Sequence, residues 1–400
     1  MRIPFSPPDI TEAEIQEVAA ALRSGWITTG PRTKQFEEMI AAFTGTPRAV
    51  CLNSATAALE MTLRILGIGP GDEVITTAYT YTASASIIDH VGAKIVLVDT
   101  DGESLNMDPV QLEAAITERT KAIIPVDVAG RMCDYSRVYR AIAAKQPLFR
   151  ANSQLQALFG RVIVVADAAH SFGARQNGLV SGQVADFTCF SFHAVKNLTT
   201  AEGGAVVWKD REGMDSEILY HEYMLASLHG QSKDALAKNS LGGWEYDIVY
   251  PAYKCNMTDV LAAIGIVQFE RYPELLKRRR AIITRYDEAF RAMGLAPFRH
   301  FDAENESSGH LYLLNIPGFD EKKRNALITA MAGRGVACNV HYKPLPMLTA
   351  YKRMGFDIKD YPHAYAKYEN EVTLPLYSRL TDEEVEFVIT ALKQSLEQLQ

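Results

Sequence analysis

The sequence predicts an α/β protein with a mostly parallel seven-stranded sheet in a large domain and a smaller C-terminal α+β domain. The first observation is a series of short runs rich in apolar and β-branched residues. The second is that helical patterns separate several of the early runs, which is typical of parallel strands joined by crossover helices. The third is a change of pattern after about residue 255, where long helices replace the short runs. We therefore assign residues 1–255 to the large domain and residues 256–400 to the small one.

Two helices are expected before the first strand. Over residues 11–25, Thr11 and Glu14 have the spacing of a capping box, and the apolar residues that follow share one helix face: Ile15, Val18 and Leu22. A second helical pattern covers residues 36–43.

The short runs are apolar throughout, which indicates strands buried on both faces of a sheet. Helices are expected between them at Ala57–Leu66 and Asp108–Thr117, and residues 146–160 form a long bridge before the fifth run. The expected strands are Ala49–Leu52, Glu73–Thr77, Ile95–Val98, Ala122–Val126, Arg161–Ala166, Phe187–Phe192 and Ala205–Trp208.

The small domain is expected to combine long helices with two short strands. Its basic run, Lys277–Arg280, is interpreted as a solvated helix face rather than a binding patch. In chain order we expect helices at Val260–Phe269 and Arg278–Met293, a strand at His310–Ile316, a helix at Lys322–Arg334, a strand at Val336–Val340 and a final helix at Asp382–Leu399.

Composition excludes several classes of protein. The net charge of −7 argues against binding to duplex nucleic acid. No apolar segment is long enough for a membrane span or a signal peptide. The five cysteines never form a CxxC pair and are expected to be reduced thiols rather than disulfides or zinc ligands. We therefore expect a cytoplasmic protein with no metal site and no nucleic-acid or membrane partner.

Polar residues follow several of the expected strands, where ligands bind in sheets of this kind. Asn53–Ala57 lies between a strand and a helix, and the free backbone N–H groups of a helix start can bind an anion. A simple N-cap is the alternative. Tyr79–Tyr81 follows the next strand and supplies either an aromatic plate for a ligand or core packing.

A carboxylate and a lysine follow two further strands. Asp167 ends a fully apolar run, where a carboxylate needs a partner because its desolvation is costly. Ala169 shares its face and leaves room for a flat group. Lys196 also follows an apolar run, and a lysine desolvated at a sheet edge becomes nucleophilic. The alternatives are a turn cap for Asp167 and a surface turn for Lys196.

These four features together match the requirements of pyridoxal phosphate (PLP). Its phosphate needs a helix start, its ring nitrogen a carboxylate, its ring an aromatic plate and its aldehyde a lysine. We expect all four at one edge of one sheet.

Six motifs follow one another along the chain: SGWITTGP at Ser24–Pro31, NSATAAL at Asn53–Leu59, AYTYTA at Ala78–Ala83, DAAHSFGA at Asp167–Ala174, SFHAVKNLTTAEGG at Ser191–Gly204 and YKCNMTDVLAAIG at Tyr253–Gly265. With these motifs in this order, the chain resembles the PLP-dependent sugar aminotransferases of the DegT/DnrJ type, which have fold type I. The resemblance covers essentially the whole chain, and SFHAVKN followed by EGG is its most specific part.

The resemblance implies a role for each matching residue. Lys196 would hold the cofactor covalently and then shuttle a proton, Asp167 would pair with the pyridine nitrogen, and His170 would lie near the phenolic oxygen. Tyr81 would stack on one face of the ring, with Ala169 under the other. The phosphate would be held by Ala55, Thr56 and Ser191.

The resemblance also implies a homodimer with shared active sites. The segment that contains Lys254 and Asn256 resembles a loop that reaches the cofactor phosphate of the neighbouring subunit. Four further residues lie in segments that often face the substrate: Trp26, Thr28, His310 and His341.

The implied reaction moves an amino group, expected to come from glutamate, to a nucleotide-diphospho-keto-sugar by a ping-pong mechanism. One alternative is a sugar dehydratase on the same scaffold, although relatives of that kind place His where this chain has Lys196. Another is a non-catalytic regulatory protein with this fold. A third is a PLP enzyme for amino acids, which would need an arginine clamp that spacing does not identify.

Overall fold

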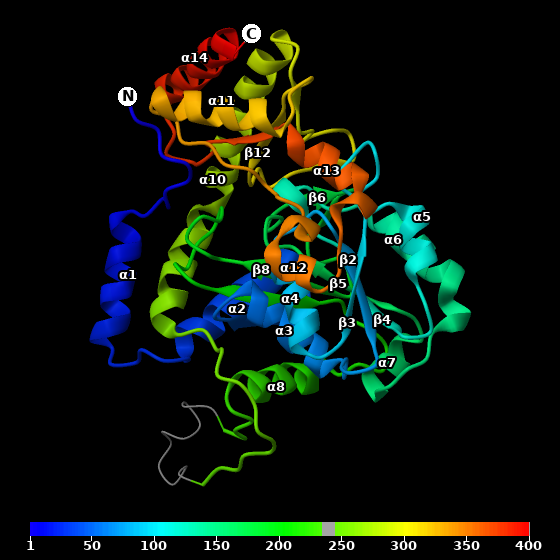
Figure 1. Ribbon diagram of the computed structural model, residues 1–400. Helices are drawn as coiled ribbons and strands as arrows, with labels where there is room; N and C mark the ends of the chain where they lie inside the picture. Colours follow the sequence, from blue (N-terminus) through cyan, green and yellow to red (C-terminus); the bar gives the residue numbers. More distant parts are fainter. Residues whose placement is uncertain (234–244, 400) are drawn as a thin grey trace.

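A seven-stranded sheet lies at the centre of the protein in the computed structural model, which describes residues 1–233 and 245–399 (Figure 1). The strand order is β1-β9-β8-β5-β4-β2-β3, and only β9 is antiparallel to its neighbours. The mostly parallel sheet predicted from the sequence is therefore confirmed. The strands are β1 (Ala49–Leu52), β2 (Glu73–Thr77), β3 (Lys94–Val98), β4 (Thr120–Ile124), β5 (Ile163–Asp167), β8 (Phe187–Ser191) and β9 (Gly204–Trp208).

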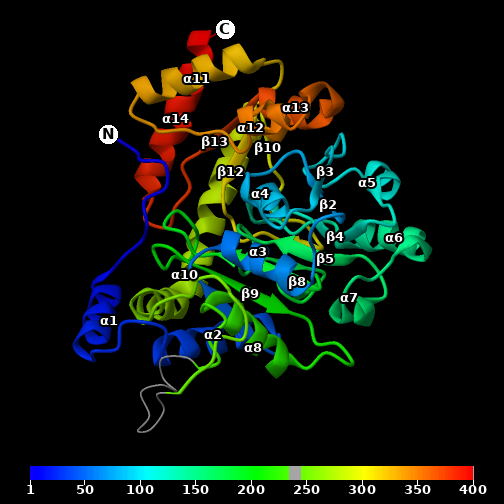
Figure 2. The ribbon, with the colours of Figure 1, turned by 60° about the horizontal axis from the view of Figure 1, so that its bottom comes forward.

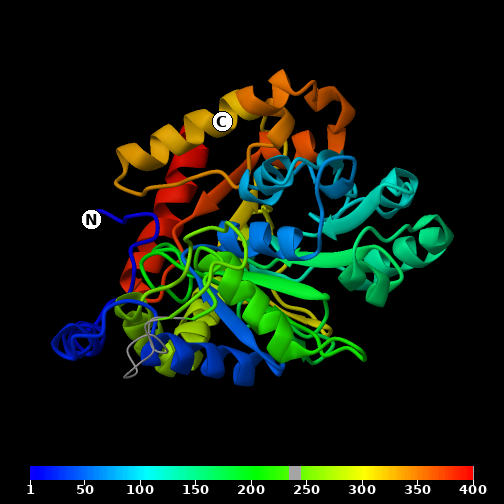
Figure 3. The same cartoon turned by 90° about the horizontal axis from the view of Figure 1, so that it is seen from below.

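Helices cover both faces of this sheet because successive strand residues point to opposite sides (Figure 3). In β1, Val50 and Leu52 pack in the core that includes α3 (Ala55–Ile65), α4 (Ala83–His90) and α8 (Ser216–Ser227). Ala49 and Cys51 instead face α2 (Pro31–Thr44) and the first half of α10 (Asp259–Ala292). Farther along the sheet, this second face packs against α5 (Pro109–Ala115) and α6 (Tyr135–Lys145). Continuous apolar runs are required because neither face meets water.

A second, three-stranded sheet lies beyond the large one, with strand order β10-β12-β13. Helix α11 (Glu321–Gly333), α14 (Asp382–Leu399) and the second half of α10 pack with this sheet around Tyr286, Leu327 and Val385 (Figures 1 and 2). Its strands are β10 (Ala296–Pro297), β12 (Tyr312–Asn315) and β13 (Glu371–Leu374).

The remaining elements are short, apart from the first helix. A small sheet joins β6 (Arg175–Gln176), β7 (Leu179–Val180) and β11 (Asn305–Glu306). The long bridge expected at residues 146–160 contains a 3-10 turn at Gln146–Leu148 and α7 (Gln154–Phe159). The other helices and 3-10 turns are α1 (Glu12–Arg23), Val128–Gly130, Leu345–Met347, α12 (Thr349–Arg353), Ile358–Asp360 and α13 (Pro362–Glu369).

Helix α10 corrects one prediction, because Val260–Phe269 and Arg278–Met293 belong to one continuous helix of 34 residues. Pro273 lies inside it. A proline in a helix interior costs a hydrogen bond and clashes with the preceding turn. Here each half is anchored in a different core, which offsets that cost. The division into residues 1–255 and 256–400 stays a prediction.

Two further predictions about the C-terminal part are wrong. The segment Val336–Val340 is not a strand. It makes only two isolated β-bridges, one between Val336 and Ile3 and one between Asn339 and Thr373. The basic run is not a uniformly solvated face. Arg279 is buried and donates to the carbonyl oxygens of Gly309 and Leu376 at 3.3 and 3.0 Å. Arg278 and Arg280 form ion pairs with Asp382 and Glu306.

Helix α1 begins with the predicted capping box between Thr11 and Glu14. Its apolar residues Ile15 and Leu22 are more than half exposed, at 53% and 55%. The helix is held instead through the buried Glu14 carboxylate, which accepts hydrogen bonds from Gln268 and Arg271 on α10.

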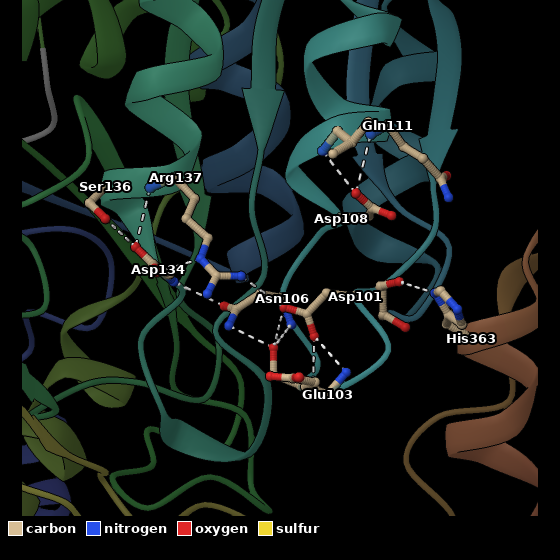
Figure 4. Close-up of polar contacts among 12 residues, drawn as sticks. Asp101, Glu103, Asn106, Asp108, Gln111, Asp134, Ser136, Arg137 and His363 are labelled. Atoms are coloured by element: carbon tan, nitrogen blue, oxygen red, sulfur yellow. Dashed lines mark hydrogen bonds and ion pairs between the residues drawn. The ribbon is translucent and has the colours of Figure 1, made fainter.

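The loop after β3 connects the large sheet to α13. Asp101 accepts from the backbone N–H of Glu103 and from the Arg137 guanidinium, and Asn106 accepts from the backbone N–H of Asp134 (Figure 4). The backbone N–H of His363 on α13 donates to Asp99 at 2.8 Å. These contacts fix the connection between the sheet and the C-terminal part. No helix within residues 1–233 and 245–399 has the length and apolar character needed to cross a bilayer.

Candidate active site

A cavity of about 350 Å³ opens at the carboxyl ends of β5 and β8. Its wall is built from the start of α3, the loop after β2, the ends of β5 and β8, and segments around residues 5, 310 and 341. Ten of the residues predicted for the site line this one cavity: Ala55, Thr56, Tyr81, Asp167, Ala169, His170, Ser191, Lys196, His310 and His341.

Asp167 is the last residue of β5 and presents a buried carboxylate to the cavity. Ser84 Oγ donates to its Oδ2 at 2.6 Å, and the backbone N–H of Ala169 donates to its Oδ1 at 3.2 Å. Burial raises the pKa of this carboxyl group, and the two hydrogen bonds and the charge of Lys196 oppose that change. None of the ion pairs among the described residues involves it. The carboxylate thus has the character required to bind a cationic ring N–H, as the expected cofactor needs.

Lys196 lies in the loop after β8 and also lines the cavity. Its backbone N–H donates to the carbonyl oxygen of His193 at 2.9 Å, which closes a tight turn. Burial lowers the pKa of the ε-amine to about 8, and the nearby Asp167 carboxylate limits the decrease. Within the part of the chain that the structure describes, no hydrogen bond or ion pair engages this nitrogen. A desolvated lysine without a structural partner is suited to act as a nucleophile.

The pKa of Lys196 gives a prediction for pH. We expect the rate at which the cofactor-free protein captures PLP covalently to rise through about pH 8 and then level off, because only the neutral amine attacks an aldehyde. Stopped-flow absorbance across a pH series measures this rate. Since the Asp167 charge raises the pKa of Lys196, Asp167→Asn is expected to move the midpoint to lower pH. A rate that is flat between pH 6 and 10 would contradict the assignment.

The first turn of α3 forms the expected anion cradle. Ser54 is the N-cap, and its Oγ accepts from the backbone N–H of Ala57 at 3.0 Å. The preceding N–H groups of Ala55 and Thr56 belong to the unsatisfied start of the helix, where the helix dipole favours an anion. An ideal Cβ on Gly204 of β9 would lie 2.3 Å from Ala55 N. The EGG motif therefore has a physical reason, since only glycine lets the strand approach the helix start this closely.

Gly204→Ala is expected to weaken PLP binding at least about tenfold and to lower the free energy of unfolding by about 1–3 kcal/mol, because the new methyl group displaces the helix start. Fluorescence titration and chemical denaturation measure the two effects. Gly333→Ala is a matched control, because a Cβ there meets nothing within 4 Å. Wild-type affinity for PLP in Gly204→Ala would show that this close approach does not shape the cradle.

His170 is buried between the β5 end and the C-terminal part. Its Nδ1 lies 3.3 Å from the backbone N of Ala129, and its Nε2 lies 2.8 Å from the hydroxyl of Tyr342. The ring of His310 meets it edge-on at 4.6 Å between centroids. Burial and the charge of Lys196 lower the pKa of His170 well below its ordinary value, so the ring is neutral at physiological pH.

His310 and His341 bring the C-terminal part into the cavity wall. His310 Nδ1 lies 3.1 Å from Asn197 Oδ1, next to the lysine. The backbone N–H of His341 donates to Glu371 at 2.9 Å, and Phe5 stacks on the His341 ring. Burial lowers the pKa of His341 to about 3. Tyr81 is 61% exposed, so it lies at the mouth of the cavity rather than inside it.

Four predicted site residues do not line this cavity. Trp26 donates from Nε1 to the carbonyl oxygen of Thr29 at 3.1 Å, and Thr28 is exposed. Lys254 is exposed and donates to Asn256, which in turn donates to Thr29 Oγ1. The substrate contacts of Trp26 and Thr28 stay predictions, and so do the roles of Lys254 and Asn256 at the cofactor phosphate of a neighbouring subunit.

Sequence reasoning missed several residues that the structure places at the site. Ser84 supplies the hydroxyl that binds Asp167, and a search for small polar residues in the helix after Tyr81 would have found it. Tyr342 follows His341 directly and shares its segment. Phe5 reaches the cavity from the N-terminus, and no motif in the sequence indicates it.

Comparisons with known proteins agree with this site. The sequence matches the DegT/DnrJ/EryC1/StrS aminotransferase family over residues 8–393. The structure is similar to that of the candidate sugar aminotransferase Spr1654 of Streptococcus pneumoniae in its PMP form, with a TM-score of 0.97 and 56% identity over 100% of both chains. The PLP form of the same protein gives a TM-score of 0.96 and 54% identity, again over 100% of both chains.

Two other relatives extend the comparison. The spore coat polysaccharide biosynthesis protein SpsC of Bacillus subtilis is 40% identical over 400 residues, which cover 98% of this chain and 96% of the relative. Helicobacter pylori PseC, an aminotransferase involved in the biosynthesis of pseudoaminic acid, is 27% identical with a TM-score of 0.85 over 100% of both chains. The motifs and the fold of the present chain agree with these similarities. The chain therefore belongs to the DegT/DnrJ/EryC1/StrS aminotransferase family.

Proposed function

We propose that the protein transfers an amino group from glutamate to a keto-sugar carried on a nucleoside diphosphate, with PLP as cofactor. The observation that carries this proposal is the joint presence, in one cavity, of a lysine without a protein partner and a buried carboxylate without an ion-pair partner among the described residues. The names of SpsC and PseC connect relatives to polysaccharide and pseudoaminic acid biosynthesis, which supports a sugar as the acceptor.

The residues of the cavity fit the cofactor in charge and in position. Bound PLP supplies an electron sink that stabilises negative charge on the carbon next to the transferred nitrogen. The N–H groups at the start of α3 bind the phosphate, and Asp167 accepts a hydrogen bond from the protonated ring nitrogen. Lys196 Nζ would hold the cofactor through its aldehyde. Once the amino donor has taken that place, the free lysine amine would take the α-proton of the donor and deliver it during the transfer.

A half-reaction tests the proposed function directly. Glutamate alone is expected to release about one equivalent of 2-oxoglutarate per subunit and to change the visible absorption of the cofactor, because a ping-pong enzyme completes the first transfer without the acceptor. A panel of UDP- and TDP-linked keto-sugars should then restore the starting spectrum. Initial-rate lines that converge when both substrates are varied would contradict the proposal.

The half-reaction and a borohydride reduction together separate the alternatives. A dehydratase would convert the sugar without forming 2-oxoglutarate in proportion to product. A non-catalytic protein would give no covalent PLP adduct at Lys196 after borohydride reduction. The presence of Lys196, rather than a histidine, at this position favours transamination over dehydration, and the intact pair of Lys196 and Asp167 argues against a non-catalytic protein.

We further propose that two subunits share their active sites, with Lys254 of one subunit at the phosphate of the other. Lys254→Ala is then expected to bind PLP less tightly. Mixing it with inactive Lys196→Ala subunits should restore up to about a quarter of the wild-type activity, because half of the randomly formed dimers hold one intact site. Activity of the mixture is measured after co-refolding. If the mixture gives no more activity than its separate components, the shared site is refuted.

A further inference from the structure

His170 makes one hydrogen bond through each of its ring nitrogens. A backbone N–H can only donate, so the contact with Ala129 N makes Nδ1 an acceptor. The neutral ring carries a single proton, which must then lie on Nε2. Nε2–H therefore donates to Tyr342 Oη, 2.8 Å away.

The surrounding contacts hold His170 in this state. Ala129 adopts a left-handed conformation with φ of 56°. Non-glycine residues adopt such a conformation only where the surroundings impose it, and here it accompanies the donation to Nδ1. Ser308 Oγ donates to the carbonyl oxygen of His170. Since Asn197 Nδ2 donates to the Ser308 carbonyl oxygen, its Oδ1 is free to accept from His310 Nδ1. The second histidine is thus occupied elsewhere and does not compete for Nε2.

The hydroxyl of Tyr342 is left with an unused proton. It accepts from His170, and it makes no other hydrogen bond within the described residues. Tyr342 lines the same cavity as Lys196 and Asp167. Its ring lies nearly parallel to that of His170, with an angle of 24° and 5.9 Å between centroids. The proton of this hydroxyl is therefore available to an acceptor inside the cavity.

We propose that the Tyr342 hydroxyl donates a hydrogen bond to the phenolic oxygen of bound PLP, and that His170 acts as a positioning residue that orients the tyrosine hydroxyl. This inference rests on the proposed function, since Lys196 and Asp167 must hold the two other sides of the cofactor ring. It changes the role predicted for His170, whose ring nitrogens are both already engaged by protein groups.

A donor at this oxygen stabilises its anionic form and lowers the pH at which the bound chromophore loses its proton. Other ionisable groups near Tyr342 act on the same equilibrium and must stay unchanged in the test. They are Asp127 and Asp167 in the cavity, His310 and His341 in its wall, Tyr81 at its mouth and the buried Glu371 behind it. Lys196 is not among them, because in the holoenzyme its amine is part of the chromophore.

The test is a pH titration of the visible absorption of the holoenzyme. Tyr342→Phe is expected to raise the apparent pKa of the chromophore by about one unit, a tenfold change. His170→Ala is expected to raise it by less, and to have no effect in the Tyr342→Phe background, because it acts only through the tyrosine. Tyr286→Phe is the matched control. It removes a buried hydroxyl that donates to the carbonyl oxygen of Pro375 at 3.1 Å in the core of the second sheet, away from the cavity lining, and should leave the titration unchanged.

Two outcomes would overturn the inference while leaving the proposed function intact. One is a wild-type titration in Tyr342→Phe, and the other is a His170→Ala shift of equal size in both backgrounds. If no PLP band forms and borohydride fixes nothing to Lys196, both proposals fail together. Nitrogen-15 NMR of histidine-labelled, cofactor-free wild-type protein tests the orientation without any variant. His170 must carry its proton on Nε2. A proton on Nδ1 would refute the proposal that His170 donates to Tyr342 and orients its hydroxyl.

Discussion

Replacing Lys196 by alanine is expected to abolish amino transfer, with a loss of at least about 10⁴-fold in turnover, while the fold is retained. The loss follows because no other amine lines the cavity among the described residues, so nothing can hold the cofactor or move the α-proton. The fold should persist because the ε-amine makes no hydrogen bond or ion pair within the described part of the protein. Turnover assays, borohydride labelling and thermal melting measure these effects.

Lys121 provides the matched control for this prediction. It is also a buried lysine, but its ammonium group donates to the carbonyl oxygens of Glu118 and Arg150 at 2.9 and 2.7 Å. Lys121→Ala should therefore lower the free energy of unfolding by about 1–3 kcal/mol and leave the turnover of the folded protein unchanged. Full activity of Lys196→Ala would disprove the assignment of the nucleophile.

Replacing Asp167 by asparagine is expected to lower the rate of the first half-reaction by about 10²–10³-fold. The amide keeps the size of the side chain and an acceptor for Ala169 N–H, but it removes the charge that keeps the ring nitrogen protonated. Without that proton the cofactor withdraws electrons poorly. Single-turnover absorbance with glutamate measures the rate, and PLP titration measures any change in affinity separately.

Asp127 is the control for this second prediction. It is buried and also lines the cavity, but its carboxylate already accepts hydrogen bonds from Cys133 N–H and from the hydroxyls of Tyr135 and Ser171. Asp127→Asn should reduce stability and leave the half-reaction rate of the folded enzyme close to wild type. An equal loss of rate in both variants would mean that Asp167 acts by supporting the structure.

The central sheet could be predicted because each of its strands has a recognisable sequence pattern. Strands buried on both faces admit only apolar and small residues, so each appears as a short uninterrupted run, and all seven were found within about two residues of their observed ends. The carboxyl-end rule then located Asp167 and Lys196, each at or just after a strand end.

The remaining errors have a common physical origin in tertiary contacts. Two helices were predicted where α10 is continuous, because the packing of its two halves in different cores, which offsets the local cost of Pro273, is not visible in the sequence. Val336–Val340 has strand-like composition, yet only single bridges reach it. Tyr342 comes from a segment well over a hundred residues away from the strands of the site. A contact between residues this far apart in the chain leaves no periodic pattern in the sequence, so it could not be predicted from it.

Helix α10 has a consequence for how the cavity is assembled. One continuous helix packs into the core beneath the large sheet and into the core of the second sheet, so it ties together two parts of the protein that both supply residues to the cavity. Rotating one part against the other would require bending this helix or unpacking one of its ends. The pocket is therefore preorganised, and most of the entropy needed to gather its distant residues is lost when the chain folds rather than when a ligand arrives.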